Sequence, residues 1–269
     1  MGTEETINKI SLRNIIDYKK EIFSSCNIVL ILTGSITERN IKFVNKELED
    51  VKINNQSKPV INDIVEVQFK RKPKIKLVKC SWRCLDIQIS FDVNLDLVTE
   101  NELLFLSSIL AGGDGSVLPK EVREKSRLVY AIYSDVEIYK QAAVLSISFS
   151  IDKGNLYIGL QKIMETLATL KCNISQRDID MNMVFFTENL WYWEEDSYEL
   201  NFQLGRNFIK EKKFYTIEEQ IKRNQEISNQ RLREVAEIIF QVKNTSIIIM
   251  GQTKKIEKKE IKHILQYIE

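Results

Sequence analysis

The sequence predicts an α+β fold, in which an antiparallel sheet is packed by helices and preceded by the end of a second, truncated half. Two observations predict it. A pattern of helix, loop, strand and glycine occurs near both ends of the chain, and the residues between show strand periodicity first and helical periodicity later. Strands followed by helices favour an α+β arrangement over an alternating parallel-sheet protein.

An internal repeat marks four positions in each of two copies: Ser11, Phe23, Asn27 and Gly34, and Ser228, Phe240, Asn244 and Gly251. The steps between them are 12, 4 and 7 residues in both copies, and no gap is needed. Each copy predicts a helix that begins after a serine N-cap, a tight loop and then a buried strand, at 28–33 and 245–250. A glycine turn then leads into a further helix, at 36–51 and 255–268.

The repeat also predicts how the chain is divided. If each copy closes a homologous half, residues 1–51 are the C-terminal end of a first α+β half. Residues 70–269 are then a complete second α+β half, and the polar residues 52–69 are the linker between the two. On this division the chain begins in the middle of a domain.

The elements of the second half follow from periodicity and from turn residues. In order, they are a strand at 73–92, a helix at 100–110, a flexible glycine-rich loop at 111–115, a helix at 120–125, strands at 128–139 and 142–152, and helices at 155–170, 175–192, 199–212 and 217–225. Lys140 and Gln141 are a short hairpin connection between two alternating runs. The second strand of the repeat then returns to the sheet.

The composition excludes several classes of function. The 39 basic and 38 acidic side chains nearly cancel, so no global field attracts nucleic acid or anionic lipid. The basic run at 70–76 is explained as a solvated linker entering a strand. No apolar run approaches the roughly 20 residues needed to cross a bilayer, and the charged N-terminus does not resemble a signal peptide. We therefore expect a cytoplasmic protein without nucleic-acid or membrane partners.

The segment 109–134 carries a resemblance to a known family. It has a glycine-rich loop that includes Gly112 and Gly113, then the pair Arg123-Glu124, then a strand start at Tyr130. This order resembles the second half of insulinase-like (pitrilysin) zinc peptidases and their relatives, the mitochondrial processing peptidases. The resemblance covers essentially the whole chain. It departs from the family at 116–119 and at Arg127, where the family has a glycine in a turn that often needs a positive φ.

The resemblance implies roles for specific residues. Arg123 and Tyr130 would face a bound peptide and hydrogen-bond its carbonyl groups, with Gly112 and Gly113 in the adjoining substrate-binding loop. Tyr130 would also steady the oxyanion formed at a zinc ion in the other half. A guanidinium and a phenol suit this task, because both remain protonated donors at neutral pH. The alternatives are a surface Arg123 paired with Glu121 or Glu124, and a half-buried Tyr130.

The family's zinc site is a His-x-x-Glu-His helix plus a later Glu, and this chain has a single histidine, His263. We therefore expect no metal site, no cofactor and no hydrolysis by this chain alone. The resemblance implies a zinc-bearing His-x-x-Glu-His half or subunit as partner and an extended peptide as substrate. A fragment, a natural split product and an inactive relative all fit this description.

Two further functions remain open from the sequence. One is a catalytically inactive structural or core subunit of a processing-peptidase-like complex. The other is a generic peptide-binding module based on the aromatic and acidic stretch 191–196, although these residues also suit a helix end followed by the N-terminus of the next helix.

Overall fold

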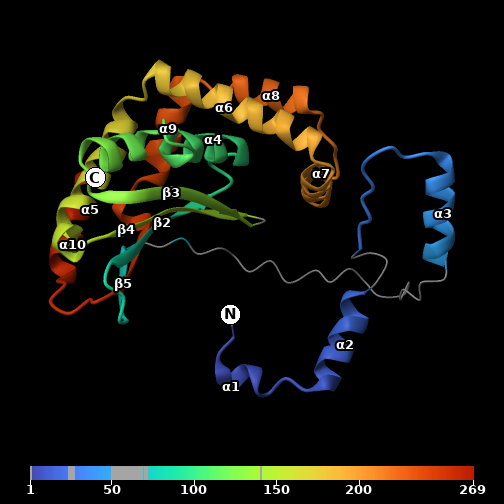
Figure 1. The fold of residues 1–269 in the computed structure, drawn as a ribbon, viewed down its shortest axis with the longest axis horizontal. Coiled ribbons are helices and arrows are strands. Elements are labelled where there is room, and N and C mark those ends of the chain that lie inside the picture. The colour runs from blue at the N-terminus through green and yellow to red at the C-terminus, as the bar shows by residue number, and fades with distance from the viewer. Residues whose placement is uncertain (1, 24–27, 50–68, 70–71, 140) are drawn as a thin grey trace. The chain divides into compact units, whose positions relative to one another are not determined.

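Five strands form one sheet, in the order β1-β5-β2-β4-β3, shown in Figure 1. The strands are β1 (Lys74–Lys79), β2 (Leu85–Asn94), β3 (Val129–Ile138), β4 (Ala142–Ile151) and β5 (Thr245–Gly251). Only β1 and β5 run parallel, while β5-β2, β2-β4 and β4-β3 are antiparallel pairs. The predicted fold class is confirmed: a mainly antiparallel sheet packed by helices.

The computed structural model describes residues 2–23, 28–49, 69, 72–139 and 141–269. The chain divides into two compact units, one of Met1–Glu66 with Trp193–Tyr215, the other of Val67–Tyr192 with Thr216–Glu269. The sequence had assigned 193–215 to the second half, so the observed units differ from that division in this segment. Most of the predicted linker 52–69 lies outside the described residues.

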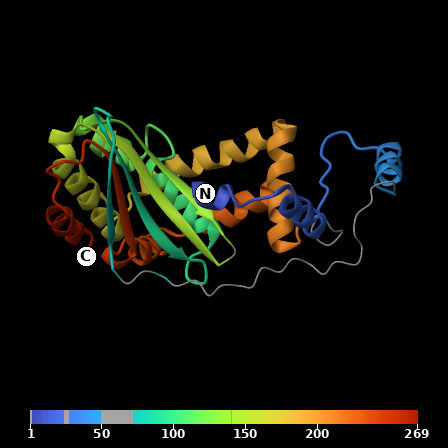
Figure 2. The same cartoon turned by 90° about the horizontal axis from the view of Figure 1, so that it is seen from below.

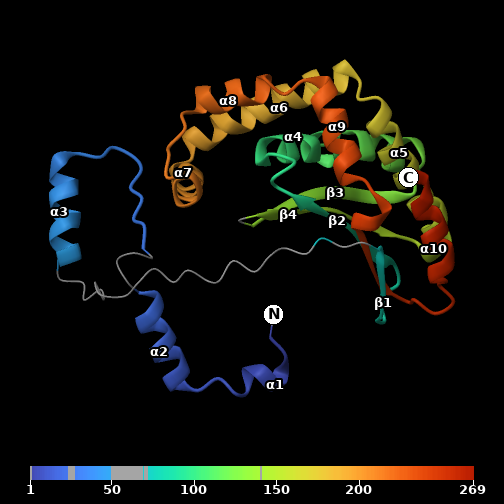
Figure 3. The same cartoon turned by 180° about the vertical axis from the view of Figure 1, so that it is seen from behind.

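The helices of the second unit lie on one side of the sheet, with some of them stacked beyond α4, as Figures 1 and 3 show. They are α4 (Glu100–Ala111), the π-helix η1 (Pro119–Lys125), η2 (Lys153–Asn155), α5 (Leu156–Cys172), α6 (Gln176–Glu195, whose end lies in the first unit), α8 (Ile217–Gln225), α9 (Asn229–Ile239), η3 (Val242–Asn244), α10 (Lys258–Ile264) and η4 (Leu265–Ile268). None of the described helices combines the length and apolar character needed to cross a bilayer.

The first unit contains α1 (Glu4–Ile7), α2 (Leu12–Ile22), α3 (Glu38–Glu49) and α7 (Ser197–Glu211). None of these four helices has a buried residue. Asp196 caps α7, because its carboxylate accepts hydrogen bonds from the backbone N–H groups of Tyr198 (2.8 Å) and Glu199 (3.3 Å). The acidic end of the stretch 191–196 therefore has a structural role at a helix N-terminus.

Alternation along the strands builds the core. In β2 every second side chain is buried against the helices: Leu85, Ile87, Ile89, Phe91 and Val93. Phe91 also meets Phe240 edge-to-face, with ring centroids 5.2 Å apart. Because the inner side chains form the core, the outer side chains of the same strands are not needed for core packing.

The two copies of the repeat share their local geometry at three described positions: Ser11 and Ser228 are N-caps, Phe23 and Phe240 are C-caps, and Gly34 and Gly251 have positive φ. The C-cap φ and ψ are −77° and 68° in the first copy, and −80° and 73° in the second. Asn27 lies outside the described residues. The repeat predicted from spacing is therefore also a repeat of backbone conformation.

The predicted strand at 28–33 is wrong, because these residues form no strand in the structure. A strand needs a neighbour, and here α7 supplies the polar partners instead. Asn201 donates from Nδ2 to the Ile31 carbonyl at 2.9 Å, and the Thr33 hydroxyl donates to the Ser197 carbonyl at 3.1 Å. The equivalent residues of the second copy lie in the sheet as β5.

The single strand predicted at 73–92 is two strands, β1 and β2, with β5 between them. Residues 80–84 carry the chain past the end of β5, where the Cys80 N–H donates to the Gly251 carbonyl at 3.0 Å. The insertion of a strand from the far end of the chain is not visible in local alternation.

A partly buried ion pair joins α4 to α9. Glu102, only 9% exposed, accepts from Arg231 Nε at 2.6 Å and from its Nη2 at 3.2 Å. The same carboxylate completes a capping box with Thr99. Burial alone would raise the pKa of Glu102, but the hydrogen bonds from Arg231 and Thr99 outweigh burial and lower it below the usual value.

We predict that Arg231→Ala lowers the free energy of unfolding at pH 7 by about 2 kcal/mol, because it leaves a buried carboxylate without its charged partner. Since the folded pKa of Glu102 is lowered, the stabilisation is present above the unfolded value of 4.5 and is lost as pH falls through the folded pKa. Urea denaturation from pH 3 to 7 measures this. Arg177→Ala, on exposed α6 surface, is the control, and a pH-independent loss in Arg231→Ala would contradict the assignment.

Candidate functional site

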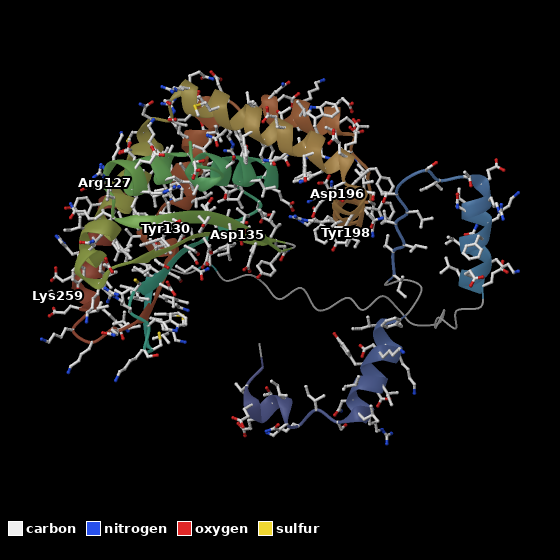
Figure 4. The ribbon with its side chains drawn as sticks, in the orientation of Figure 1. Arg127, Tyr130, Asp135, Asp196, Tyr198 and Lys259 are labelled. Carbon is white, nitrogen blue, oxygen red and sulfur yellow. The ribbon has the colours of Figure 1, made fainter. Side chains whose placement is uncertain are left out.

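Tyr130 lies at the start of β3, as labelled in Figure 4, and Figure 2 shows the sheet from the side that the second unit's helices leave uncovered. Its side chain is 91% exposed, so the half-buried alternative is wrong. The pairing of β3 with β4 is irregular between Val129 and Ile132, which marks a bulge. A bulge re-aims side chains, and here it presents Tyr130 outside the regular register of the strand.

Arg127 stands three residues before Tyr130 and has a φ of 52°. The turn therefore has the positive backbone angle that the sequence comparison with the family had suggested. A non-glycine residue in this region is strained, because Cβ approaches the following carbonyl group. The turn is closed nonetheless by the Arg127 N–H, which donates to the Arg123 carbonyl at 3.1 Å.

The uncovered face has a low floor. Strand register places small polar side chains side by side at its centre: Ser90, Ser146, Ser148, Ser150 and Ser246. The Ser90 and Ser146 hydroxyls are hydrogen-bonded at 3.0 Å, and Gln88 Nε2 donates to Ser146 at 3.0 Å. Taller side chains of β3 and β5 stand on either side of this floor.

The low floor and tall walls make a hollow of about 420 Å³. It is lined by Asp86, Ile87, Gln88, Tyr130, Ala131, Tyr133, Ser148, Phe149, Ser150, Ile248 and Met250. One row of the sheet crosses it, since Ile248, Gln88, Ser148 and Tyr133 are successive cross-strand partners. Tyr130 therefore lines a hollow whose volume is in the range of small-ligand pockets.

Arg123 lies on η1 and forms an ion pair with Asp114 of the glycine-rich loop, with Nη1 2.6 Å from Oδ1. The alternative partners were Glu121 and Glu124. Glu121 pairs instead with Lys125 (2.6 Å) and Lys162 (3.6 Å); the hydrogen bond from Lys125 is the main reason that its pKa is lowered. Arg123 is not among the residues that line the hollow beside Tyr130.

The glycine-rich loop is organised by Ser116, which is buried. Its hydroxyl accepts from the Gly113 N–H and donates to the Ser108 carbonyl, both at 3.0 Å. A Cβ at Gly112 would lie 2.8 Å from the Ser108 backbone, so close approach requires glycine there. A Cβ at Gly113 would meet nothing within 4 Å, so packing places no such demand on this position.

The residues that the structure describes do not fit a zinc ion. Among the described residues, no group of three His, Cys, Asp or Glu side chains is arranged to hold a metal. His263 is exposed on α10, between Lys262 and the buried Ile264.

Sequence reasoning missed the other residues of the hollow, above all Tyr133, Gln88, Ile248 and Met250. The serine alternation at 146–150 was a visible signal that β4 has an outer face. The register that sets these serines between Tyr133 of β3 and Ile248 of β5 depends on pairing between distant segments, which local patterns do not contain.

The fold and the site together define an α+β half with one helix-covered face and one open face that carries an exposed tyrosine. Residues 9–183 match the family Peptidase M16 inactive domain, and the chain belongs to that family. This confirms the resemblance to the C-terminal half of insulinase-like zinc peptidases.

Individual relatives agree. The uncharacterized zinc protease YmxG of Bacillus subtilis (strain 168) is 23% identical over 241 residues, which cover 89% of this chain and 58% of the relative. The peptidase M16 inactive domain structure from Pseudomonas fluorescens superimposes with a TM-score of 0.81 at 17% identity, covering 95% of this chain and 61% of that one. A chain of Complex III2 from Candida albicans, with Inz-5 bound, gives 0.80 at 12% identity, covering 98% and 64%. The chain thus spans about three fifths of each relative's length.

We predict that Arg127→Gly raises the free energy of unfolding by about 0.5 to 1 kcal/mol. A positive φ destabilises the folded state by about 1 to 2 kcal/mol for a residue with a Cβ, and glycine removes this cost. Glycine also makes the unfolded chain more flexible, which lowers the gain in stability by about 0.5 to 1 kcal/mol. Urea denaturation measures the change. Arg127→Ala, which keeps Cβ, is the control and should give no gain; a loss of stability in Arg127→Gly would show that the arginine side chain itself matters.

Proposed function

We propose that this chain is the non-metal-binding companion half of an insulinase-like zinc metallopeptidase. In this proposal it contributes Tyr130 and Arg123 to peptide binding and to transition-state contacts, while a partner half with a His-x-x-Glu-His helix holds the zinc. The observation that carries the proposal is the almost fully exposed Tyr130, set by a bulge at the wall of the hollow. Membership of the peptidase family supports it.

The chemistry asked of Tyr130 is hydrogen-bond donation. Of the residues that the structure describes, none bonds the Tyr130 side chain, so its hydroxyl is available to a ligand. A donor aimed at the oxygen that becomes negative during peptide hydrolysis stabilises the transition state more than the ground state. Tyr130 would supply such a donor without itself changing its protonation state.

Arg123 is already paired, yet this does not bar it from binding a peptide. Asp114 is largely exposed and Arg123 is itself partly solvated, and exposed ion pairs contribute only about 0 to 1 kcal/mol. A peptide carbonyl or carboxylate group can therefore displace Asp114 at little cost. In the proposal Asp114 holds the guanidinium in place until a peptide arrives, and Gly112 and Gly113 allow the loop to accommodate it.

The first unit supports the need for a partner. Several repeat positions are buried in the second copy and exposed in the first. Leu232, Val235 and Ile247 of the second copy correspond to Ile15, Tyr18 and Leu30 of the first. The three residues of the second copy are at most 1% exposed, whereas the three residues of the first copy are 55 to 63% exposed. Exposed apolar side chains at positions that are buried in the homologous copy are typical of an interface, and we propose that the zinc-bearing half covers them.

We predict that zinc-dependent cleavage of a quenched unfolded peptide appears only when this chain is mixed with a His-x-x-Glu-His-bearing half of the same family. Tyr130→Phe should then lower kcat by about 100- to 1,000-fold, because one oxyanion donor is lost. Tyr139→Phe, which removes an exposed phenol near the hairpin tip, is the matched control. Full activity of Tyr130→Phe, or turnover by the lone chain with bound zinc, would contradict the proposal.

We also predict that Ile15→Asn weakens binding to the zinc-bearing half by at least about tenfold, because burying an isoleucine contributes about 1.5 to 3 kcal/mol. The unfolding of the chain itself should change little, since Ile15 is exposed within its unit. Calorimetric titration measures the affinity, with Lys20→Asn on a different face of α2 as control. Equal affinities of the two variants would show that this surface is not the interface.

The second candidate function is that of a structural subunit without a catalytic role, and it is favoured by the fold similarity to a chain of Complex III2. A stable complex with the zinc-bearing half that cleaves no peptide would support it. Either function is proposed to operate in the cytoplasm, which cell fractionation would test.

A further inference from the structure

The uncovered face of the sheet has an uneven distribution of charge. The outer positions of the described strands β2, β3, β4 and β5 carry four carboxylates and no basic side chain; the carboxylates are Asp86, Asp92, Asp135 and Glu137. Asp135 and Tyr130 can be followed along β3 in Figure 4. The basic side chains of this face, Lys74 and Lys76, stand on the edge strand β1. A positively charged group is therefore favoured over β2 to β4.

The hollow combines three kinds of wall. Tyr130 and Tyr133 contribute aromatic rings from β3, while Ile248 and Met250 contribute apolar side chains from β5. Between them lies the carboxylate of Asp86, which accepts a hydrogen bond from the Ser150 hydroxyl. Among the described residues, no lysine or arginine lines the hollow and Asp86 has no ion pair.

We infer that this hollow receives the side chain of a lysine or arginine residue of an extended peptide, an inference that rests on the proposed function. The aliphatic stem of such a side chain packs on Ile248 and Met250, as long cationic side chains do on apolar surface. Its charged head reaches Asp86 and the tyrosine rings. Carboxylates and ring faces both attract a cation, and a guanidinium stacks on aromatic rings as well.

Other side chains fit the hollow less well. A wholly apolar side chain would take the Asp86 carboxylate out of water and leave it with the Ser150 hydroxyl but no cation to balance its charge. An acidic side chain would meet the Asp86 carboxylate, which has the same sign of charge. The nearest basic residue in the same row, Lys76, is separated from Gln88 by Ile248, which places their Cα atoms about 10 Å apart at the usual strand spacing. Lys76 is not among the residues that line the hollow.

The test compares two labelled, unstructured ten-residue peptides that differ at one central position, arginine in one and citrulline in the other. Citrulline keeps the shape of arginine and removes its charge. Binding to the full chain is measured by fluorescence anisotropy at low salt. We expect the arginine peptide to bind at least about tenfold more tightly, and Asp86→Asn to remove this preference while citrulline-peptide binding stays unchanged.

A matched variant distinguishes binding of the cation in the hollow from its attraction to the overall negative charge of the sheet face. Glu137→Gln removes a carboxylate of the same face, four residues beyond Tyr133 on β3, and should keep most of the preference. If Glu137→Gln and Asp86→Asn reduce it equally, the cation is held by the field and the assignment to the hollow is wrong. Equal binding of both peptides by the unmodified chain overturns the inference and leaves the proposed function standing. Failure to bind either peptide contradicts the proposed function itself.

Discussion

A β-strand sends successive side chains to opposite faces of its sheet, and the second unit depends on how strictly β2 and β4 follow this rule. Their inner positions are occupied by large apolar side chains such as Phe91 and Leu145, which are fully buried. Their outer positions are mostly polar and small. Because the described helices of the second unit pack on one side of the sheet, the hollow and the exposed Tyr130 lie on the opposite side, where these helices do not cover the strands. The ion pair between Glu102 and Arg231 lies on the packed side, where it joins two helices.

The internal repeat shows how one sequence pattern has different outcomes in different surroundings. Both copies begin a helix at a serine cap and end it with the same backbone angles. The second copy then continues into β5, which β1 and β2 accept as a neighbour. Among the described residues of the first unit no strand neighbours the first copy, and its apolar segment accepts a hydrogen bond from Asn201 of α7. Helix caps are local and were predictable, whereas a strand exists only where a sheet receives it.

The same distinction explains which parts of the fold and the site could be predicted. The helix at 100–110 and the hairpin of β3 and β4 depend on short-range periodicity and were predicted closely. Tyr130 was proposed as a site residue because its spacing from the glycine-rich loop resembles a family pattern, and the structure places it exposed on the open face. The partner of Arg123 was missed: Asp114 is nine residues away in sequence and is brought near by the turn that Ser116 organises. The hollow was missed because Gln88, Ser148 and Ile248 belong to three strands separated by many residues, and only the pairing register sets them in one row.

The serine floor has a consequence for how such a surface can diversify. Replacing Ser148 or Ser150 with a larger residue would raise the floor and reshape the hollow, yet the side chains next to them along β4, Ile147, Phe149 and Ile151, point into the core and would keep their packing. On the proposed function, selectivity for a peptide and stability of the fold are thus encoded at alternate positions of the same strands. Variation can accumulate in one set while the other is conserved, so close homologues with superimposable cores are free to differ widely in what they bind.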